Sequence, residues 1–138
     1  MINRQKRNQG MNWIRQEKRL AIYLRDGMAC MYCGDSIENG AILSLDHIKP
    51  HSKGGDNSEK NLICACKKCN SSRGNRTLKS FCESVAEYLN HGVDSNEMVK
   101  AIRRNTRRKL SPCLVEAKQL IERRGSAYAV LNNKGEEK

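Results

Sequence analysis

The sequence is poor in aromatic residues, in proline and in hydrophobic residues generally. Phe, Trp and Tyr make up 4% of the 138 residues, only two residues are proline, and 38% are hydrophobic. No run of 18 apolar residues occurs, so the sequence offers no candidate membrane span. The few aromatic residues also argue against a platform for stacking single-stranded bases. We expect one domain with a thin hydrophobic core, which an additional cross-link would stabilise.

Acidic residues are outnumbered by basic ones. The sequence has 26 Lys and Arg against 15 Asp and Glu, which gives a net charge of +11. Residues 1–27 and residues 94–138 each carry a net charge of +5, whereas residues 28–93 are almost neutral. Two basic flanks around a balanced centre favour a nucleic acid as partner, and they have no purpose in an enzyme acting on neutral small molecules.

The N-terminal segment is basic but is followed by no apolar stretch of the kind that a secretory signal contains. We therefore expect a cytoplasmic protein. Seven cysteines are present, an odd number, and four of them form two Cys-x-x-Cys pairs. Without a sign of secretion, metal ligation or redox chemistry is expected rather than a disulfide framework.

Charge and turn residues divide the sequence into four parts. These are a basic arm at 1–11, a core at 12–93, a basic helical extension at 94–131 and a polar tail at 132–138. Hydrophobic spacing and capping residues also predict the individual elements. Helices are predicted at 13–26, 78–89, 94–110 and 111–125, and short strands at 41–45 and 62–65.

The two Cys-x-x-Cys pairs predict a structural zinc site formed by Cys30, Cys33, Cys66 and Cys69. A two-residue gap lets a tight turn direct two thiolates at one ion, and two such turns complete a tetrahedron. A redox pair normally opens a helix after a strand in a thioredoxin-like context, which is missing here. Four thiolates leave no open coordination position, so the zinc is not expected to be catalytic. The remaining cysteines, Cys64, Cys82 and Cys113, are assigned to packing.

Four polar residues lie between the cysteine pairs or directly after them. Asp46 and His47 are neighbours on a predicted strand, so their side chains point to opposite faces, and one can bind a metal while the other faces a substrate. Asn61 and Asn70 complete the set. Taken singly, each residue also has an ordinary explanation in a turn, a loop or a helix cap.

The segment from Cys30 to Gly74 resembles the zinc-bearing, four-cysteine type of HNH endonuclease. The motifs occur in that family's order: Cys-x-x-Cys, Asp-His, a Gly-Gly turn, Asn-Leu and Cys-x-x-Cys-Asn. The resemblance covers about a third of the chain. It implies an α+β fold with a ββα-metal core, flanked here by an N-terminal helix and several C-terminal helices.

The resemblance also implies a role for each of the four polar residues. His47 corresponds to the general base that activates water, and Asp46 to the carboxylate ligand of a catalytic metal. Asn61 corresponds to the amide that holds the loop and orients the histidine. Asn70 stands where the founding pattern has histidine, and its amide oxygen would be the second metal ligand. Such oxygen ligands favour Mg²⁺ or Mn²⁺.

The activity implied is hydrolysis of DNA, taken as double-stranded, to 5′-phosphate and 3′-hydroxyl ends. A non-catalytic zinc module that binds nucleic acid, and a nuclease acting on RNA, remain open alternatives. His51 is interpreted equally well as a turn residue or as a catalytic one. Contacts to phosphates are expected from basic residues, for which solvated charge is the alternative. These are Lys67, Lys68, Arg73, Arg76 and Lys79, with Lys100, Arg103, Arg104, Arg107, Arg108 and Lys109 further along the chain.

Overall fold

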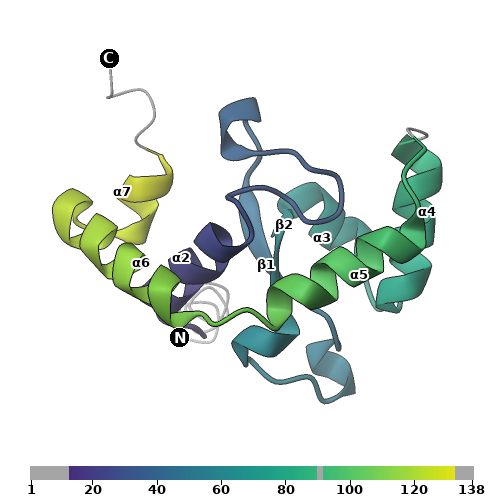
Figure 1. Ribbon diagram of the computed structural model, residues 1–138, viewed down its shortest axis with the longest axis horizontal. Helices are drawn as coiled ribbons and strands as arrows, with labels where there is room; N and C mark the ends of the chain where they lie inside the picture. Colours follow the sequence, from purple (N-terminus) through teal and green to yellow (C-terminus); the bar gives the residue numbers. More distant parts are fainter. Residues whose placement is uncertain (1–12, 90–91, 133–138) are drawn as a thin grey trace, which may run out of the picture.

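The computed structural model describes residues 13–89 and 92–132, so the expected basic arm and nearly all of the expected polar tail lie outside it. In this described part, six α-helices surround a two-stranded antiparallel sheet (Figure 1), and the α+β prediction is confirmed. The elements are α2 (Gln16–Arg25), β1 (Leu43–His47), β2 (Leu62–Cys66), α3 (Lys67–Arg73), α4 (Leu78–Leu89), α5 (Ser95–Thr106), α6 (Ser111–Arg124) and α7 (Ala127–Leu131), with 3-10 turns η1 (Ile37–Asn39), η2 (His51–Lys53) and η3 (Glu59–Asn61). None of the described helices has the length and apolar character needed to cross a membrane.

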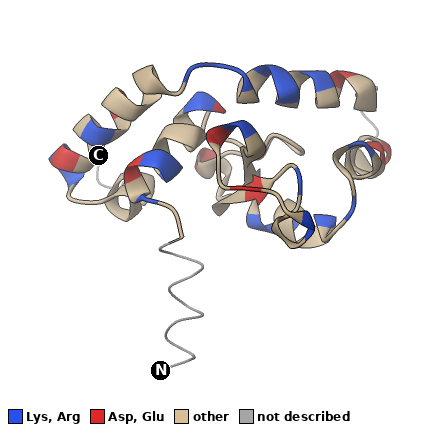
Figure 2. Ribbon diagram, turned by 90° about the horizontal axis from the view of Figure 1, so that it is seen from below, with Lys and Arg blue, Asp and Glu red and all other residues tan. Residues whose placement is uncertain are grey.

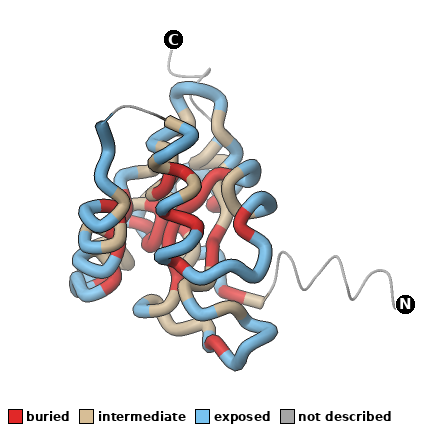
Figure 3. Tube along the Cα trace, turned by 90° about the vertical axis from the view of Figure 1, so that its right-hand side faces the viewer, coloured by how far each residue is buried: buried red, intermediate tan, exposed pale blue. Residues whose placement is uncertain are grey.

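Strand β2 is the centre of the fold. It pairs with β1 in a register that joins Leu43 to Cys66 at one end and His47 to Leu62 at the other. All five residues of β2 are buried. Because side chains alternate along a strand, Leu62 and Cys64 enter one hydrophobic cluster and Ile63 enters a second one. Figure 3 shows these buried residues gathered in the middle of the molecule, beneath an exposed outer layer.

The two hydrophobic clusters attach the C-terminal helices on different sides of the sheet. The first cluster joins Leu20 of α2 to Ala117 of α6 and Ala127 of α7. The second joins the cysteine turns to Phe81 of α4 and Ile102 of α5. In Figure 1, α2, α6 and α7 accordingly lie on one side of the strands and α4 and α5 on the other. Burial of this apolar surface fixes all of these helices around the strands.

The predicted helices are present with shifted ends. The helix expected to reach residue 110 ends at Thr106, and the buried Leu110 instead precedes α6. Helix α3 was not among the helices predicted from spacing; it begins at Lys67, immediately after β2. The short helix α7 was not predicted, because five residues offer too little periodicity to detect.

The strand expected at residues 41–45 lies two residues later, at Leu43–His47. The prediction followed the apolar run, but the side chain of Ile42 is 67% exposed and contributes nothing to the core. The shift places Asp46 and His47 inside β1, where the antiparallel ladder fixes their backbone.

A buried ion pair connects α2 to the rest of the fold. The guanidinium of Arg25 donates to both carboxylate oxygens of Asp26, at 2.8 and 3.0 Å, and both side chains are fully buried. Arg25 also donates to the carbonyl oxygens of Glu59 and Leu62. Asp26 in turn accepts from the amide of Cys64 on β2 and from the side chain of Asn105 on α5.

We expect Asp26→Asn to destabilise the protein by about 3–5 kcal/mol, because the isosteric change leaves the Arg25 charge buried without a counter-ion. The substitution also replaces one acceptor oxygen by an amide NH2 group, which would face other hydrogen-bond donors. Urea unfolding followed by circular dichroism measures the change. The matched control is Glu97→Gln, which breaks the exposed Glu97–Lys100 pair and should cost no more than about 0.5 kcal/mol. Similar losses for both variants would contradict the role given to the buried pair.

Candidate active site and metal centre

The four paired cysteines meet in space, and we refer to them as the thiol cluster. The sulfur atoms of Cys30, Cys33, Cys66 and Cys69 all lie within 4.8 Å of one another, and those of Cys33 and Cys66 are 3.8 Å apart. A tetrahedral zinc ion with Zn–S distances of about 2.3 Å separates its ligands by about 3.8 Å. The donor set and its spacing therefore fit zinc.

Backbone hydrogen bonds shape both turns of the thiol cluster. The sulfur of Cys30 accepts from the amides of Tyr32 and Cys33, at 3.4 and 3.5 Å. The sulfur of Cys66 accepts from the amide of Cys69 at 3.4 Å and caps the N-terminus of α3. These N–H donors stabilise negative charge on sulfur, as metal-bound thiolates require.

The thiols also perturb one another. The hydrogen bond with Cys69 lowers the pKa of Cys30 to about 5, whereas burial raises the pKa of Cys33 to about 11. The pKa of Cys69 is raised, first by its hydrogen bond with Cys30 and then by burial. By themselves Cys33 and Cys69 therefore stay protonated, whereas Cys30 favours the thiolate form. A bound divalent cation would stabilise all four in the deprotonated form.

Arg73 is buried beneath the site, with 1% of its surface exposed. Its guanidinium donates to Asp46 Oδ2 at 2.8 Å, to the Tyr32 hydroxyl at 3.1 Å, and to the backbone oxygens of His47 and Ile48. The expectation that Arg73 contacts phosphates is thus wrong, because its hydrogen-bonding groups face inward. It ties α3 to the end of β1 instead.

The carboxylate of Asp46 is held on one side only. Its Oδ2 accepts from Arg73 and from the hydroxyl of Tyr32, whose ring packs edge-on against Phe81. Burial, with the neighbouring Asp46 charge, raises the pKa of Tyr32, so the phenol stays protonated and donates. Among the described residues, no hydrogen bond engages Oδ1 of Asp46, which leaves this oxygen available to a ligand.

Asn70 projects from α3 toward β1. Its Nδ2 donates to Ser44 Oγ and to the carbonyl oxygen of Leu45, both at 2.9 Å. Fixing the amine end against the strand turns the amide oxygen away from it. Within the described part of the chain no donor engages this Oδ1, so it is the second uncommitted hard oxygen of the site.

The imidazole of His47 is positioned by side chains that the sequence analysis did not single out. Its Nε2 lies 2.8 Å from Oδ1 of Asn57. An amide oxygen only accepts, so Nε2 carries the proton and Nδ1 keeps its lone pair. The rings of Trp13 and His51 lie beside the imidazole, with centroids at 5.2 and 5.9 Å.

Asn61 closes the loop between the strands. Its Oδ1 accepts from the amide of Lys49, and its Nδ2 donates to the carbonyl oxygens of Lys49 and Asp56. The loop backbone passes so close here that a Cβ at Gly55 would lie 1.8 Å from the Lys49 carbonyl oxygen. Only glycine fits at that position, which accounts for one residue of the Gly-Gly motif.

Three of the four predicted site residues line a single cavity of about 410 Å³, which we refer to as the polar cavity. Asp46 and His47 come from β1 and Asn70 from α3, while Asn61 acts from behind the loop and does not line it. The complete lining is Asp46, His47, Pro50, His51, Ser52, Asn70, Gly74 and Asn75. The polar cavity thus combines an imidazole, a carboxylate and an amide, which is the donor set for a hard divalent cation beside a base.

The other basic residues expected to contact phosphates are exposed. Figure 2 shows some of them as blue segments on α5 and on the linker to α6. None of them lines the polar cavity. Arg76 is exposed but engaged, since it donates to Ser84 and to two backbone oxygens and lies over the ring of Phe81. The basic residues that the sequence placed on one helix at 94–110 do not share a helix. Helix α5 carries Arg103 and Arg104, whereas Arg107 and Arg108 follow its end.

Sequence reasoning missed Tyr32 and Asn57, and it expected Arg73 to contact phosphates although its side chain is buried. Tyr32 lies inside the first Cys-x-x-Cys turn, so its proximity to the site could have been suspected from the zinc prediction. Asn57 sits in a polar turn where asparagine is ordinary. The burial of Arg73 leaves no local signal, because its partners other than the carbonyl oxygen of Arg76 lie 25 to 41 residues away in the chain.

Comparison with known proteins identifies the segment that contains this site. The family described as HNH endonuclease matches residues 30–76. The chain is 31% identical over 80 residues to the CRISPR-associated endonuclease Cas9 of Corynebacterium diphtheriae, a match that covers 57% of this chain and 7% of that protein. It is 42% identical over 50 residues to the CRISPR-associated endonuclease Cas9 of Actinomyces naeslundii, covering 36% of this chain and 4% of that protein. The chain therefore spans only a small part of the length of these curated relatives.

We expect the purified protein to carry about one zinc ion per chain, as a single tetrahedral site requires. Cys33→Ser should lose most of this zinc and melt at a lower temperature, because a hydroxyl is a poor substitute for a thiolate ligand. Native mass spectrometry and thermal unfolding measure both effects. Cys113→Ser changes a thiol outside the thiol cluster and should keep the zinc. A zinc-free wild type, or equal zinc in both variants, would refute the assignment.

Proposed function

We propose that the protein is a metal-dependent DNA endonuclease, on the basis of the match of residues 30–76 to the HNH endonuclease family. In this proposal His47 is the general base, and a divalent ion binds to Asp46 and Asn70. The reaction hydrolyses a phosphodiester bond and leaves 5′-phosphate and 3′-hydroxyl ends.

One observation carries the proposal: Asp46, His47 and Asn70 line the same polar cavity. They come from a strand and from a helix that follows the next strand, so only the fold brings them together. A protein that merely binds nucleic acid through zinc and basic residues has no need of an imidazole beside two uncommitted hard oxygens. The arrangement favours an enzyme over a binding module.

His47 is suited to take a proton from water. Its Nε2–H is held by Asn57, which leaves Nδ1 as the basic atom of the ring. The flanking rings of Trp13 and His51 restrict its rotation. Asn61 positions His47 indirectly, because it fixes the loop that carries Asn57.

At phosphorus, the proposed step forms one P–O bond and breaks another. The water oxygen attacks phosphorus while its proton passes to Nδ1 of His47, and the bond from phosphorus to the 3′ oxygen breaks. A solvent water molecule then gives a proton to the departing 3′ oxygen, and the hydroxide so formed takes the proton from Nδ1. Because water is the nucleophile, the reaction does not require a 2′-hydroxyl, and DNA can be the substrate.

Asp46 and Asn70 would hold the cation through their uncommitted Oδ1 atoms. When bound there, a hard divalent ion such as Mg²⁺ or Mn²⁺ supplies charge stabilisation for the phosphate and the leaving oxygen. Arg73 and Tyr32 keep the Asp46 carboxylate in position by occupying its other oxygen. The thiol cluster has no open position and contributes only to structure.

Two observations support a nucleic acid as the substrate. Both curated relatives are named as endonucleases, and the chain carries a net charge of +11. Such an excess of positive charge attracts a polyanion and makes binding depend strongly on salt.

We expect His47→Ala to abolish nicking or cleavage of plasmid DNA in the presence of magnesium, because the base is lost and the other imidazole of the polar cavity, His51, is not the one that Asn57 orients. DNA binding and thermal stability should be close to those of the wild type. Gel analysis of plasmid over a panel of divalent metals measures activity, and fluorescence anisotropy measures binding. Equal cleavage by the variant and the wild type would defeat the catalytic assignment.

Asn57 is expected to act as a positioning residue for His47. Asn57→Ala should lower kcat roughly 10- to 100-fold, because the imidazole loses the hydrogen bond that sets its orientation and tautomer. Asn57→Asp keeps an acceptor and should restore most of the activity. Its added negative charge favours protonated His47, so the acidic limb of the pH–rate profile should move to higher pH. An unchanged profile and an unchanged kcat in both variants would contradict this role.

A further inference from the structure

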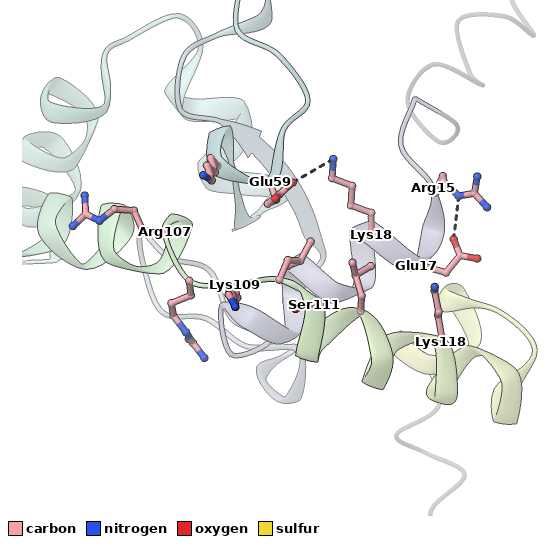
Figure 4. A pocket seen from close by; sticks show the side chains of 12 residues that line it. Arg15, Glu17, Lys18, Glu59, Arg107, Lys109, Ser111 and Lys118 are labelled. Carbon is pink, nitrogen blue, oxygen red and sulfur yellow. Dashed lines mark ion pairs between the residues drawn. The ribbon is translucent and has the colours of Figure 1, made fainter.

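A second, larger hollow lies between α2, η3, the α5–α6 linker and α6, and we refer to it as the basic cavity. Its volume is about 720 Å³. Figure 4 shows side chains from all of these elements around the same space. The lining consists of Arg15, Glu17, Lys18, Glu59, Lys60, Arg107, Arg108, Lys109, Leu110, Ser111, Leu114 and Lys118.

The basic cavity concentrates the positive charge of the molecule. Seven of its lining residues are basic and two are acidic, a net charge of +5, against +11 for the whole chain. Both acidic residues are already paired, Glu17 with Arg15 and Glu59 with Lys18, each at 3.7 Å. The remaining cations therefore dominate the field in this hollow.

The unpaired cations stand on fixed backbone. For Lys60, Arg107, Lys109 and Lys118, no carboxylate of the described residues lies within ion-pair distance, and all four residues are exposed. The linker that carries two of them is anchored, because Leu110 is buried and the guanidinium of Arg108 donates to the backbone oxygen of Arg25. These charges are held around one hollow rather than dispersed over the surface.

Asn57 connects the basic cavity to the polar cavity. Lys18, which lines the basic cavity, donates from Nζ to the carbonyl oxygen of Asn57 at 2.9 Å. The side chain of the same Asn57 holds the imidazole of His47 at 2.8 Å. One residue therefore separates a cation of the basic cavity from the proposed base.

We propose that the basic cavity binds the phosphodiester backbone of the nucleic acid next to the segment that the polar cavity cuts. This inference rests on the proposed function, because it places a second part of the same substrate. Cations contributed by several elements match the repeated charges of a polymer, whereas a single phosphate is usually held by converging donors. The α6 region is thereby assigned a binding role outside the matched HNH segment.

The test compares two triple variants that each remove three positive charges. In the first, Arg107→Gln, Lys109→Gln and Lys118→Gln remove three of the unpaired cations of the basic cavity. The comparison variant combines Lys100→Gln, Arg103→Gln and Arg104→Gln, which the sequence also predicted to contact phosphates but which lie on α5 and do not line the basic cavity. Lys18 and Arg108 are kept, since both make structural hydrogen bonds.

Binding of a fluorescent duplex DNA is measured by anisotropy over a range of salt concentrations, with His47→Ala present in every protein to prevent cleavage. The basic-cavity variant should weaken binding at least about tenfold and reduce the slope of log K against log salt by about one for each phosphate that is no longer neutralised. The α5 variant should change both much less. Circular dichroism checks that both variants are folded.

Equal losses in the two triple variants would overturn the inference, because they would indicate a diffuse field rather than a site. Wild-type affinity in the basic-cavity variant would overturn it as well. Plasmid cleavage by the protein with an intact His47 is measured separately. Binding that depends on the basic cavity without any cleavage would reject the endonuclease proposal while supporting the cavity assignment.

Discussion

The meeting of four sulfur atoms at one point is the constraint on which the rest of the site depends. The thiol cluster joins the turn at Cys30–Cys33 to the junction where β2 ends and α3 begins. That turn carries Tyr32, and that helix carries Asn70 and Arg73. Once the cluster is closed, these three side chains can only project toward β1. The geometry of the polar cavity therefore depends on the geometry of the thiol cluster, which lies several residues away in the chain.

The sequence predicted those parts of the fold and site whose determinants are local. Two residues between cysteines produce a turn of fixed shape, so the thiol cluster could be predicted from spacing alone. The helix caps Thr77 and Asp94 accept hydrogen bonds from the amides of Ser80 and Asn96, as their position before an amphipathic stretch indicated. The apolar run at residues 41–45 located strand β1 to within two residues.

What the sequence did not reveal depends on contacts distant in the chain. Arginine is seldom buried, and nothing near Arg73 indicates that Tyr32 and Asp46 will surround it. Asn57 resembles an ordinary turn residue until the fold brings His47 within 2.8 Å. The basic cavity could not be predicted from the sequence either. Its cations come from segments about 100 residues apart that meet only when α6 packs against α2.

The charges around the polar cavity determine how a cation and a substrate depend on each other. Asp46 is the single carboxylate among the described residues that line the polar cavity, and the guanidinium of Arg73 already offsets its charge. A divalent ion bound to the uncommitted oxygens of Asp46 and Asn70 would therefore meet little net negative charge. In the proposed reaction a phosphate of the substrate would supply the missing charge, so ion and nucleic acid would reinforce each other in this pocket. Because the ion alone would be held weakly, affinity for the nucleic acid must come from elsewhere on the surface, and the basic cavity beyond Asn57 has the charge and the position to provide it.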